Sequence, residues 1–187
     1  LTIHIWPKNW SWIRAMNPDA LKRMMENGGP TMYGQPAGRG NRPAMPALNI
    51  DSMSNVAVQV DNAIAKTKDY IDAHLTVARA LNKPMVISEF GYPRDHHRYD
   101  LDDTTAGRDA YYGYVFERLV DSYDAKDNLA GCNFWAWGGT GRASHLFWQP
   151  WDDYLGDPSQ EEQGLNAVFD TDTTLGVIKS FEAQLHE

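Results

Sequence analysis

The fold of this chain is constrained most by three short apolar runs, each of which precedes a longer segment of helical periodicity. The runs cover residues 1–6, 84–90 and 131–137, and a polar loop with glycine or proline follows each of them. Apolar residues then recur at three- and four-residue steps over 56–81, 106–124 and 174–186. Strands that alternate with helices in this way predict an α/β fold, with helices packed outside a parallel sheet. We therefore expect one domain, residues 1–187, built from three βα units.

Local signals set the expected helix boundaries. The first helix should end just before Pro84, because proline pushes the preceding residue out of helical geometry. Thr104 or Thr105 is the expected cap of the second helix, and Tyr123 belongs to the apolar side that we expect that helix to bury. The stretch DTDTT at 170–174 lacks the glycine and terminal glutamate of a calcium loop, so we expect it to begin the third helix.

Two long segments interrupt the alternation. Residues 27–55 are rich in glycine, proline and asparagine, and we expect a loop inserted between the first strand and its helix. Residues 138–172 form a second long loop after the last strand, and they carry several aromatic residues. Both loops follow the carboxyl end of a strand, which is the end where α/β folds bind their ligands.

Glu89 stands where the apolar strand Met-Val-Ile ends, within the stretch SEFG. A carboxylate at the carboxyl end of a parallel strand lies at the rim of the sheet, where catalytic groups gather. The same position also suits a structural glutamate that caps a helix or forms a salt bridge, for example with Arg94. The position of Glu89 alone does not separate these interpretations.

Tryptophans near the strand ends favour a sugar site. His4 and Trp6 share one face of the first strand, and Trp135 shares a face of the third strand with Trp137. Pyranose rings expose flat C–H faces that stack on indole, and a carboxylate such as Glu89 can bond their hydroxyls. Filling a hydrophobic core is an equally good explanation for Trp137. The residues expected to bind substrate are His4, Trp6, Trp10, Trp135 and Trp151.

Four stretches together resemble glycoside hydrolase family 5, and specifically its β-mannanase branch. They read IHIWPKNWSW, YIDAHLTVARALNKPMVISEFGYPRD, NFWAWGG and QGLNAVFDTD. The resemblance implies a (β/α)₈ TIM barrel of which this chain holds strands six to eight, that is, a partial barrel with long βα loops. It implies that Glu89 is the catalytic nucleophile, that His4 and Trp6 lie beside it, and that Trp135 floors the sugar subsite at the cleaved bond. It implies no cofactor.

A retaining glycosidase also needs a second carboxyl, about 5–5.5 Å from the nucleophile, as general acid and base. In the family that this chain resembles, the acid/base follows an asparagine, and no Asn-Glu pair occurs in these 187 residues. We therefore expect the usual acid/base to be absent from the chain. The remaining acids that could approach Glu89 are Asp95, Asp152, Asp153, Glu161 and Glu162.

The expected three-stranded sheet would leave two unpaired edges, which is unfavourable in water. A complete barrel takes about 250 residues, so we expect a fragment or a truncated form. We also expect it to form a homo-oligomer or to pair with a complementary N-terminal half.

The net charge of −8 and the isoelectric point near 5.1 argue against nucleic acid and against an anionic membrane surface. No apolar run approaches the ~20 residues that span a bilayer. The spacing of histidines and acids at 95–103 fits no common metal site. We expect a secreted or periplasmic protein.

The function that we expect is a retaining, endo-β-1,4-mannanase-like hydrolysis of plant polysaccharide. A cellulase or xylanase of the same family would use the same chemistry on another polymer. A truncated half-barrel that binds oligosaccharide without cleaving it is the third possibility.

Overall fold

The computed structural model describes residues 1–13, 55–97, 103–159 and 161–185. Its main sheet consists of three parallel strands in the order β1-β2-β3. The strands are β1 (Thr2–Ile5), β2 (Met85–Phe90) and β3 (Leu129–Phe134). The helices within these residues are α3 (Val56–Leu81), α4 (Ala106–Asp124) and α5 (Thr174–Leu185), with a short 3₁₀ turn η1 (Asp95–His97). The predicted α/β fold with parallel strands and three helices is confirmed.

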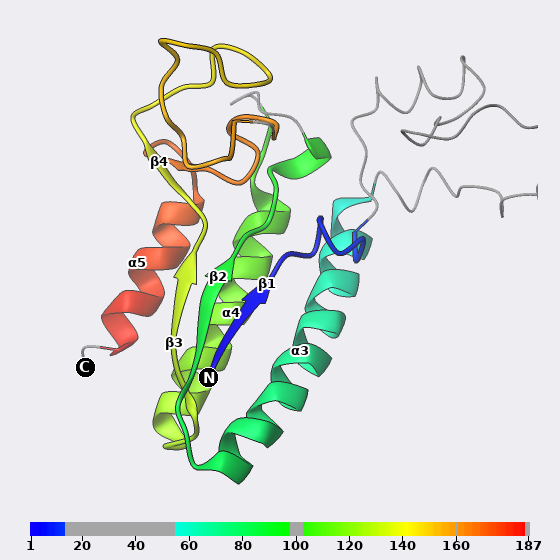
Figure 1. Cartoon of the computed structure of the whole chain (residues 1–187), viewed down its shortest axis with the longest axis vertical. Helices are drawn as coiled ribbons and strands as arrows, with labels where there is room; N and C mark the ends of the chain where they lie inside the picture. The colour runs from blue at the N-terminus through cyan, green and yellow to red at the C-terminus, as the bar shows by residue number, and fades with distance from the viewer. Residues whose placement is uncertain (14–54, 98–102, 160, 186–187) are drawn as a thin grey trace, which may run out of the picture.

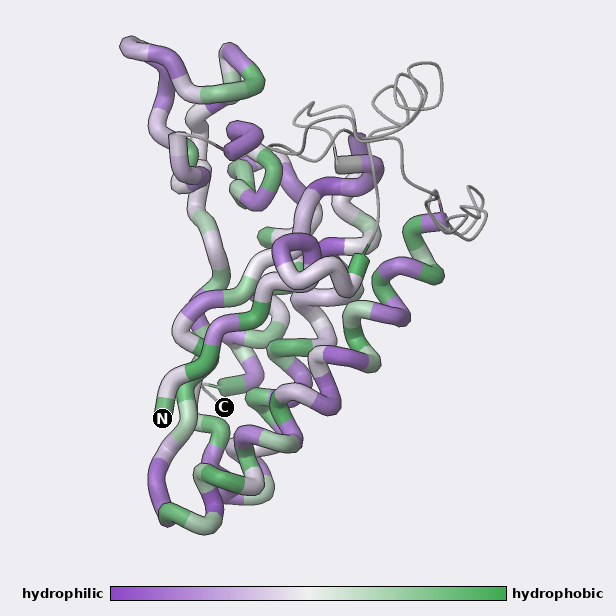
Figure 2. Tube along the Cα trace, turned by 45° about the vertical axis from the view of Figure 1, so that its right-hand side comes forward, coloured by the Kyte–Doolittle hydropathy of each residue, from purple (hydrophilic) through white to green (hydrophobic). Residues whose placement is uncertain are grey.

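The helices pack on one face of the sheet, and all three strands point towards the same end of the molecule (Figure 1). Alternate strand residues enter a core that they share with α3 and α4. Figure 2 shows hydrophobic and hydrophilic residues alternating along α3, as expected for a helix with one buried side. The fully buried members of this core include Ile5, Ile71, Met85, Ile87, Phe90 and Tyr112.

The opposite face of the sheet carries small or polar side chains. Thr2, His4 and Asn133 are exposed there, whereas Ser88 is half-buried. The outer edges of β1 and β3 pair with no other strand among the described residues. Within the described part of the chain, one face and both edges of the sheet are thus uncovered.

The third strand differs from its predicted bounds, 131–137. It begins at Leu129, whose backbone N–H and C=O both bond the Ser122 hydroxyl of α4 at 3.0 Å. It ends at Phe134, because the backbone of Ala136 bonds Asn166 and Val168 rather than a neighbouring strand of the main sheet. Beyond this point a second, two-stranded parallel sheet pairs β4 (Trp137–Gly139) with β5 (Val168–Phe169), both at the rim of segment 138–172.

Two predictions concern the packing of α4. Thr105 occupies the N-cap position, as one of the two predicted caps, but its side chain makes no capping bond. Asp95 instead accepts hydrogen bonds from the N–H groups of Ala106 (2.8 Å) and Gly107 (3.0 Å). The second prediction, that Tyr123 is buried, is wrong. Tyr123 is 64% exposed rather than buried, because it lies beside the open edge of β3.

The predicted inserted loop, 27–55, lies outside the described residues except for Asn55. The side chain of Asn55 accepts a hydrogen bond from the Val58 N–H and begins α3. Among the residues that the structure describes, no helix is both long and apolar enough to cross a bilayer.

Candidate active site

Glu89 lies at the carboxyl end of β2, directly beside His4 of β1. The two residues are register partners in the parallel sheet, and His4 Nδ1 lies 3.2 Å from Glu89 Oε2. The Glu89 side chain is 34% exposed, so one carboxylate oxygen is oriented while the group stays accessible. The alternative salt bridge with Arg94 is not formed, since Arg94 bonds Asp172 at 2.6 Å.

Two indoles gather at the same strand ends. The rings of Trp6 and Trp135 lie 6.2 Å apart between centroids and meet nearly edge to face, at 74°. Gly91 lies against both residues. A Cβ at this position would come within 2.6 Å of Trp6 Cζ3 and 3.0 Å of the Trp135 carbonyl oxygen, so only glycine fits here. The chain therefore places two half-buried tryptophans against the backbone that follows Glu89.

The backbone around Trp135 is held on several sides. Its N–H donates to the Phe90 carbonyl at 2.7 Å, and its own carbonyl accepts a bond from the Tyr112 hydroxyl at 3.3 Å. The next residue donates to the Asn166 carbonyl at 3.3 Å and accepts a bond from Val168 at 2.8 Å. These bonds fix the position of the indole relative to β2.

A buried charge cluster ties the end of segment 138–172 to β2 and α4. Arg108 has no exposed surface and donates to the carbonyls of Tyr92, Leu165 and Ala167 as well as to Asp172. Burial lowers the pKa of the Arg108 guanidinium, and the facing Asp172 carboxylate opposes that shift. Since carbonyls and a carboxylate satisfy the cation, the cluster can hold the site rim in one position.

A second buried carboxyl belongs to Asp157. It accepts hydrogen bonds from the Gly164 N–H (2.9 Å) and the Asn166 side chain (3.4 Å). Burial raises the pKa of Asp157 to about 6, because desolvation disfavours its charged form more than these bonds favour it. Gly156, just before it, packs against Ala136, so the turn at Asp157 supports the segment that carries Trp135.

The structure brings four of the six predicted site residues together, namely His4, Trp6, Glu89 and Trp135. Trp10 instead packs on Trp12 and on Tyr70 of α3, with ring centroids 5.0 and 5.2 Å away. Trp151 is fully exposed in segment 138–172.

Most acids considered as proton donors are engaged elsewhere. Asp95 caps α4, Asp152 pairs with His145 at 2.9 Å, and Asp153 accepts a bond from the Arg142 N–H at 3.0 Å. Glu162 pairs with Lys8 at 3.6 Å. Glu161 is half-buried, and its backbone N–H bonds the Pro158 carbonyl. Among the described residues, no group of three or more potential metal ligands clusters closely enough to hold an ion.

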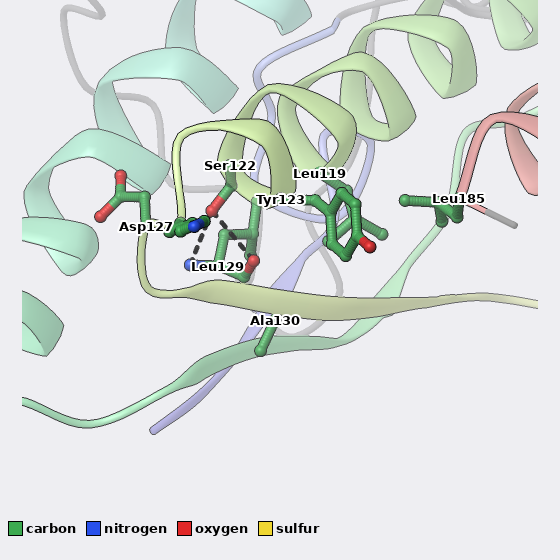
Figure 3. A pocket seen from close by; sticks show the side chains of 8 residues that line it. Leu119, Ser122, Tyr123, Asp127, Leu129, Ala130 and Leu185 are labelled. Carbon is green, nitrogen blue, oxygen red and sulfur yellow. Dashed lines mark hydrogen bonds between the residues drawn. The ribbon is translucent and has the colours of Figure 1, made fainter. Parts of the chain in front are cut away.

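Two hollows lie outside this constellation. One, of about 510 Å³, is lined by Tyr123 and Leu129 together with Leu119, Ala130 and Leu185 (Figure 3). It lies at the start of β3, at the opposite end of the sheet from Glu89. The other, of about 550 Å³, lies between Trp137 and Tyr154. Sequence reasoning missed both hollows, and it also missed the roles of Arg108 and Asp157.

An accessible carboxylate at the end of a parallel strand, beside two indoles, is the arrangement of a glycoside hydrolase site. The chain belongs to glycoside hydrolase family 5: residues 49–187 match the family described as GH family 5 beta-mannosidase-like. This confirms the family resemblance of the sequence.

Solved structures agree with this assignment. The chain is similar to the crystal structure of a glycoside hydrolase family 5 mannosidase from Rhizomucor miehei, with 26% identity and a TM-score of 0.70. It is 27% identical, again with a TM-score of 0.70, to an alanine variant of a family 5 mannosidase from the same organism in complex with mannosyl-fructose. Each match covers 99% of this chain and 37% of the other. No curated protein matches the chain.

Proposed function

We propose that this chain carries the nucleophile half of a retaining, endo-β-1,4-mannanase-like glycoside hydrolase, with Glu89 as the nucleophile. One observation carries the proposal: Glu89 is accessible at the end of β2 beside His4, and the Trp6–Trp135 pair packs on Gly91, two residues further along the chain. We assign the role of sugar platform to Trp135 and a supporting position beside the nucleophile to His4 and Trp6.

The reaction would have two steps. In the first step, a Glu89 oxygen bonds the anomeric carbon and the bond from that carbon to the leaving oxygen breaks. The leaving oxygen keeps the electron pair and takes a proton, and a covalent glycosyl intermediate forms. Water then attacks the same carbon from the opposite face, gives up a proton and releases Glu89 as a carboxylate. Two inversions leave the configuration retained.

The proposed preference for mannose rests on the similarity to family 5 mannosidases. Cleavage within the polymer, rather than at its end, is a further part of the proposal. A cellulase or xylanase would place the same nucleophile under another sugar. Hydrolysis rates on mannan, carboxymethyl cellulose and xylan distinguish these polymers.

We propose that the protonating carboxyl comes from the strands that would complete a (β/α)₈ barrel in an N-terminal half. Another copy of the chain would cover the sheet edges but, having the same sequence, would not supply the usual acid/base. The edges of β1 and β3, which no described strand covers, support this view, as does the hollow that contains Tyr123 and Leu129 beside one of these edges (Figure 3). A compact monomer in sedimentation at micromolar concentration would refute self-association. Because its polymer substrate does not enter cells, we place the protein in the periplasm or outside the cell.

The nucleophile can be tested without the missing acid. We would incubate the chain with 2-deoxy-2-fluoro-β-mannosyl fluoride, whose fluoride leaves without protonation, and map the adduct by mass spectrometry. We expect one adduct, on Glu89, and none in Glu89→Gln. Glu117→Gln, which alters an exposed glutamate of α4, is the matched control and should still be labelled.

Labelling that persists in Glu89→Gln would refute the nucleophile assignment. An unlabelled parent chain that still binds mannohexaose would leave the third possibility, sugar binding without cleavage.

A further inference from the structure

We propose that Trp137 and Tyr154 form a second carbohydrate platform, adjoining the site at Glu89 but separate from it. This inference rests on the proposed function in one respect: the ligand is a stretch of the same β-linked polysaccharide. The platform occupies the open groove of about 550 Å³ that Trp137, Tyr154, Asp153 and residues 138–141 line.

Both aromatic side chains face solvent. Trp137 is 56% exposed and Tyr154 is 75% exposed, although Trp137 begins β4 and Tyr154 lies in segment 138–172. Large aromatic side chains that converge on one surface groove mark a binding site more often than scattered ones do. The pairing of Trp137 with Val168 between β4 and β5 holds the backbone of the platform in place.

Glycines line the groove beside Trp137. A Cβ at Gly139 would lie 3.2 Å from Trp137 Nε1, and the positive φ of Gly139, 58°, also disfavours a side chain there. A Cβ at Gly141 would come within 2.7 Å of Leu155. The floor is therefore backbone, and the indole lies over it.

The groove combines flat aromatic walls with polar groups, and this combination selects the ligand. Asp153 uses one carboxylate oxygen to accept a bond from the Arg142 N–H at 3.0 Å, and its other oxygen can still accept bonds from hydroxyls. Pyranose units offer C–H faces for the aromatic π surfaces and hydroxyls for the carboxylate. An apolar segment would leave Asp153 desolvated, and the net charge of −8 disfavours nucleic acid.

The platform lies close to the active site along the chain. Trp137 follows Trp135 by two residues, so their Cα atoms are separated by at most about 7 Å. A polymer bound across Glu89 and Trp135 could therefore extend onto Trp137 and Tyr154. The platform would lengthen the bound stretch and favour polymers over short oligosaccharides.

The test uses the Glu89→Gln chain, to prevent turnover, and β-1,4-mannohexaose as the probe. Indole N–H signals in ¹H–¹⁵N spectra, assigned by single Trp→Phe substitutions, report on each tryptophan separately. We expect the signals of both Trp135 and Trp137 to shift. Trp137→Ala and Tyr154→Ala should each weaken affinity about tenfold, as the loss of one aromatic contact does. Tyr123→Ala removes a tyrosine of α4 that is 64% exposed and lies at the other end of the sheet, so it should leave affinity unchanged.

The outcomes separate the two proposals. A shift at Trp135 without one at Trp137 would overturn the platform and leave the active site intact. A shift at Trp137 alone would support the platform and overturn the active-site assignment. If no indole responds to mannohexaose or to cellohexaose, both proposals fail.

Discussion

Replacing Asp157 by asparagine should change how the stability of the protein depends on pH. Asp157 is 1% exposed and accepts hydrogen bonds from Gly164 and Asn166. The charged or titratable groups near it are Arg108, Tyr112 and Asp172. Its pKa rises from the usual 3.8 to about 6, and the leading cause is desolvation.

The sign and size follow from proton linkage. The folded protein holds the proton of the Asp157 carboxyl more tightly than the unfolded chain does. The stabilisation of the folded state by this protonated carboxyl is therefore fully present below pH 3.8 and is lost as pH rises through 6. A shift of about two pKa units corresponds to about 3 kcal/mol of unfolding free energy. Asp157→Asn cannot titrate, and it loses roughly 1 kcal/mol at every pH because one hydrogen bond is mismatched.

The assay is urea unfolding followed by tryptophan fluorescence at several pH values from 4 to 7. Relative to the unaltered protein, the variant should gain about 2–3 kcal/mol across this range. Asp121→Asn, on the exposed side of α4, controls for the removal of one surface charge. A stability difference between Asp157→Asn and the parent that does not vary with pH would refute the reasoning.

Three further substitutions test the packing around the site. Gly91→Ala would place a Cβ within 2.6 Å of Trp6 and displace its ring. Mannohexaose binding, measured by calorimetry, should therefore weaken several-fold. Unchanged affinity would show that the Trp6 indole does not contribute to binding. Asp172→Ala leaves two buried guanidinium groups without their carboxylate and should lower the unfolding free energy in urea by about 3–5 kcal/mol, whereas a loss below 1 kcal/mol would contradict the cluster's role. Asp95→Ala removes the cap of α4 and should cost about 1–2 kcal/mol in thermal unfolding followed by circular dichroism; no loss would mean that solvent caps the helix equally well.

Local patterns in the sequence were sufficient to predict the helices. The bounds Val56–Leu81 and Ala106–Asp124 coincide with the predicted ones, because each helix buries one side at a 3.6-residue period. Glu89 could be placed at a strand end for a similar reason, since an apolar run stops beside it. These predictions depend only on residues that are close together in the chain.

The features that sequence reasoning missed depend on contacts between distant residues. The end of β3 is set by bonds from Ala136 to Asn166 and Val168, some thirty residues later. The cap of α4 comes from Asp95, eleven residues before the N–H that it bonds. Arg108 on an amphipathic helix has the sequence signature of a solvated residue. Its burial is explained by acceptors distant in sequence, namely three backbone carbonyls and the Asp172 carboxylate.

In the proposed mechanism, the two chemical steps would require an acid/base carboxyl to different degrees, and the trapping experiment uses this difference. The contacts that orient Glu89 and Trp135, from His4, Phe90 and Tyr112, come from within the described chain. Formation of the glycosyl intermediate needs those contacts and a leaving group, and fluoride leaves without a proton. Hydrolysis of the intermediate needs a base to activate water. The 2-fluoro substituent slows hydrolysis of the adduct in either case, so the readout is the lifetime of the adduct. A chain that holds only the nucleophile half should retain the adduct longest, whereas a partner that supplies the base should shorten its lifetime.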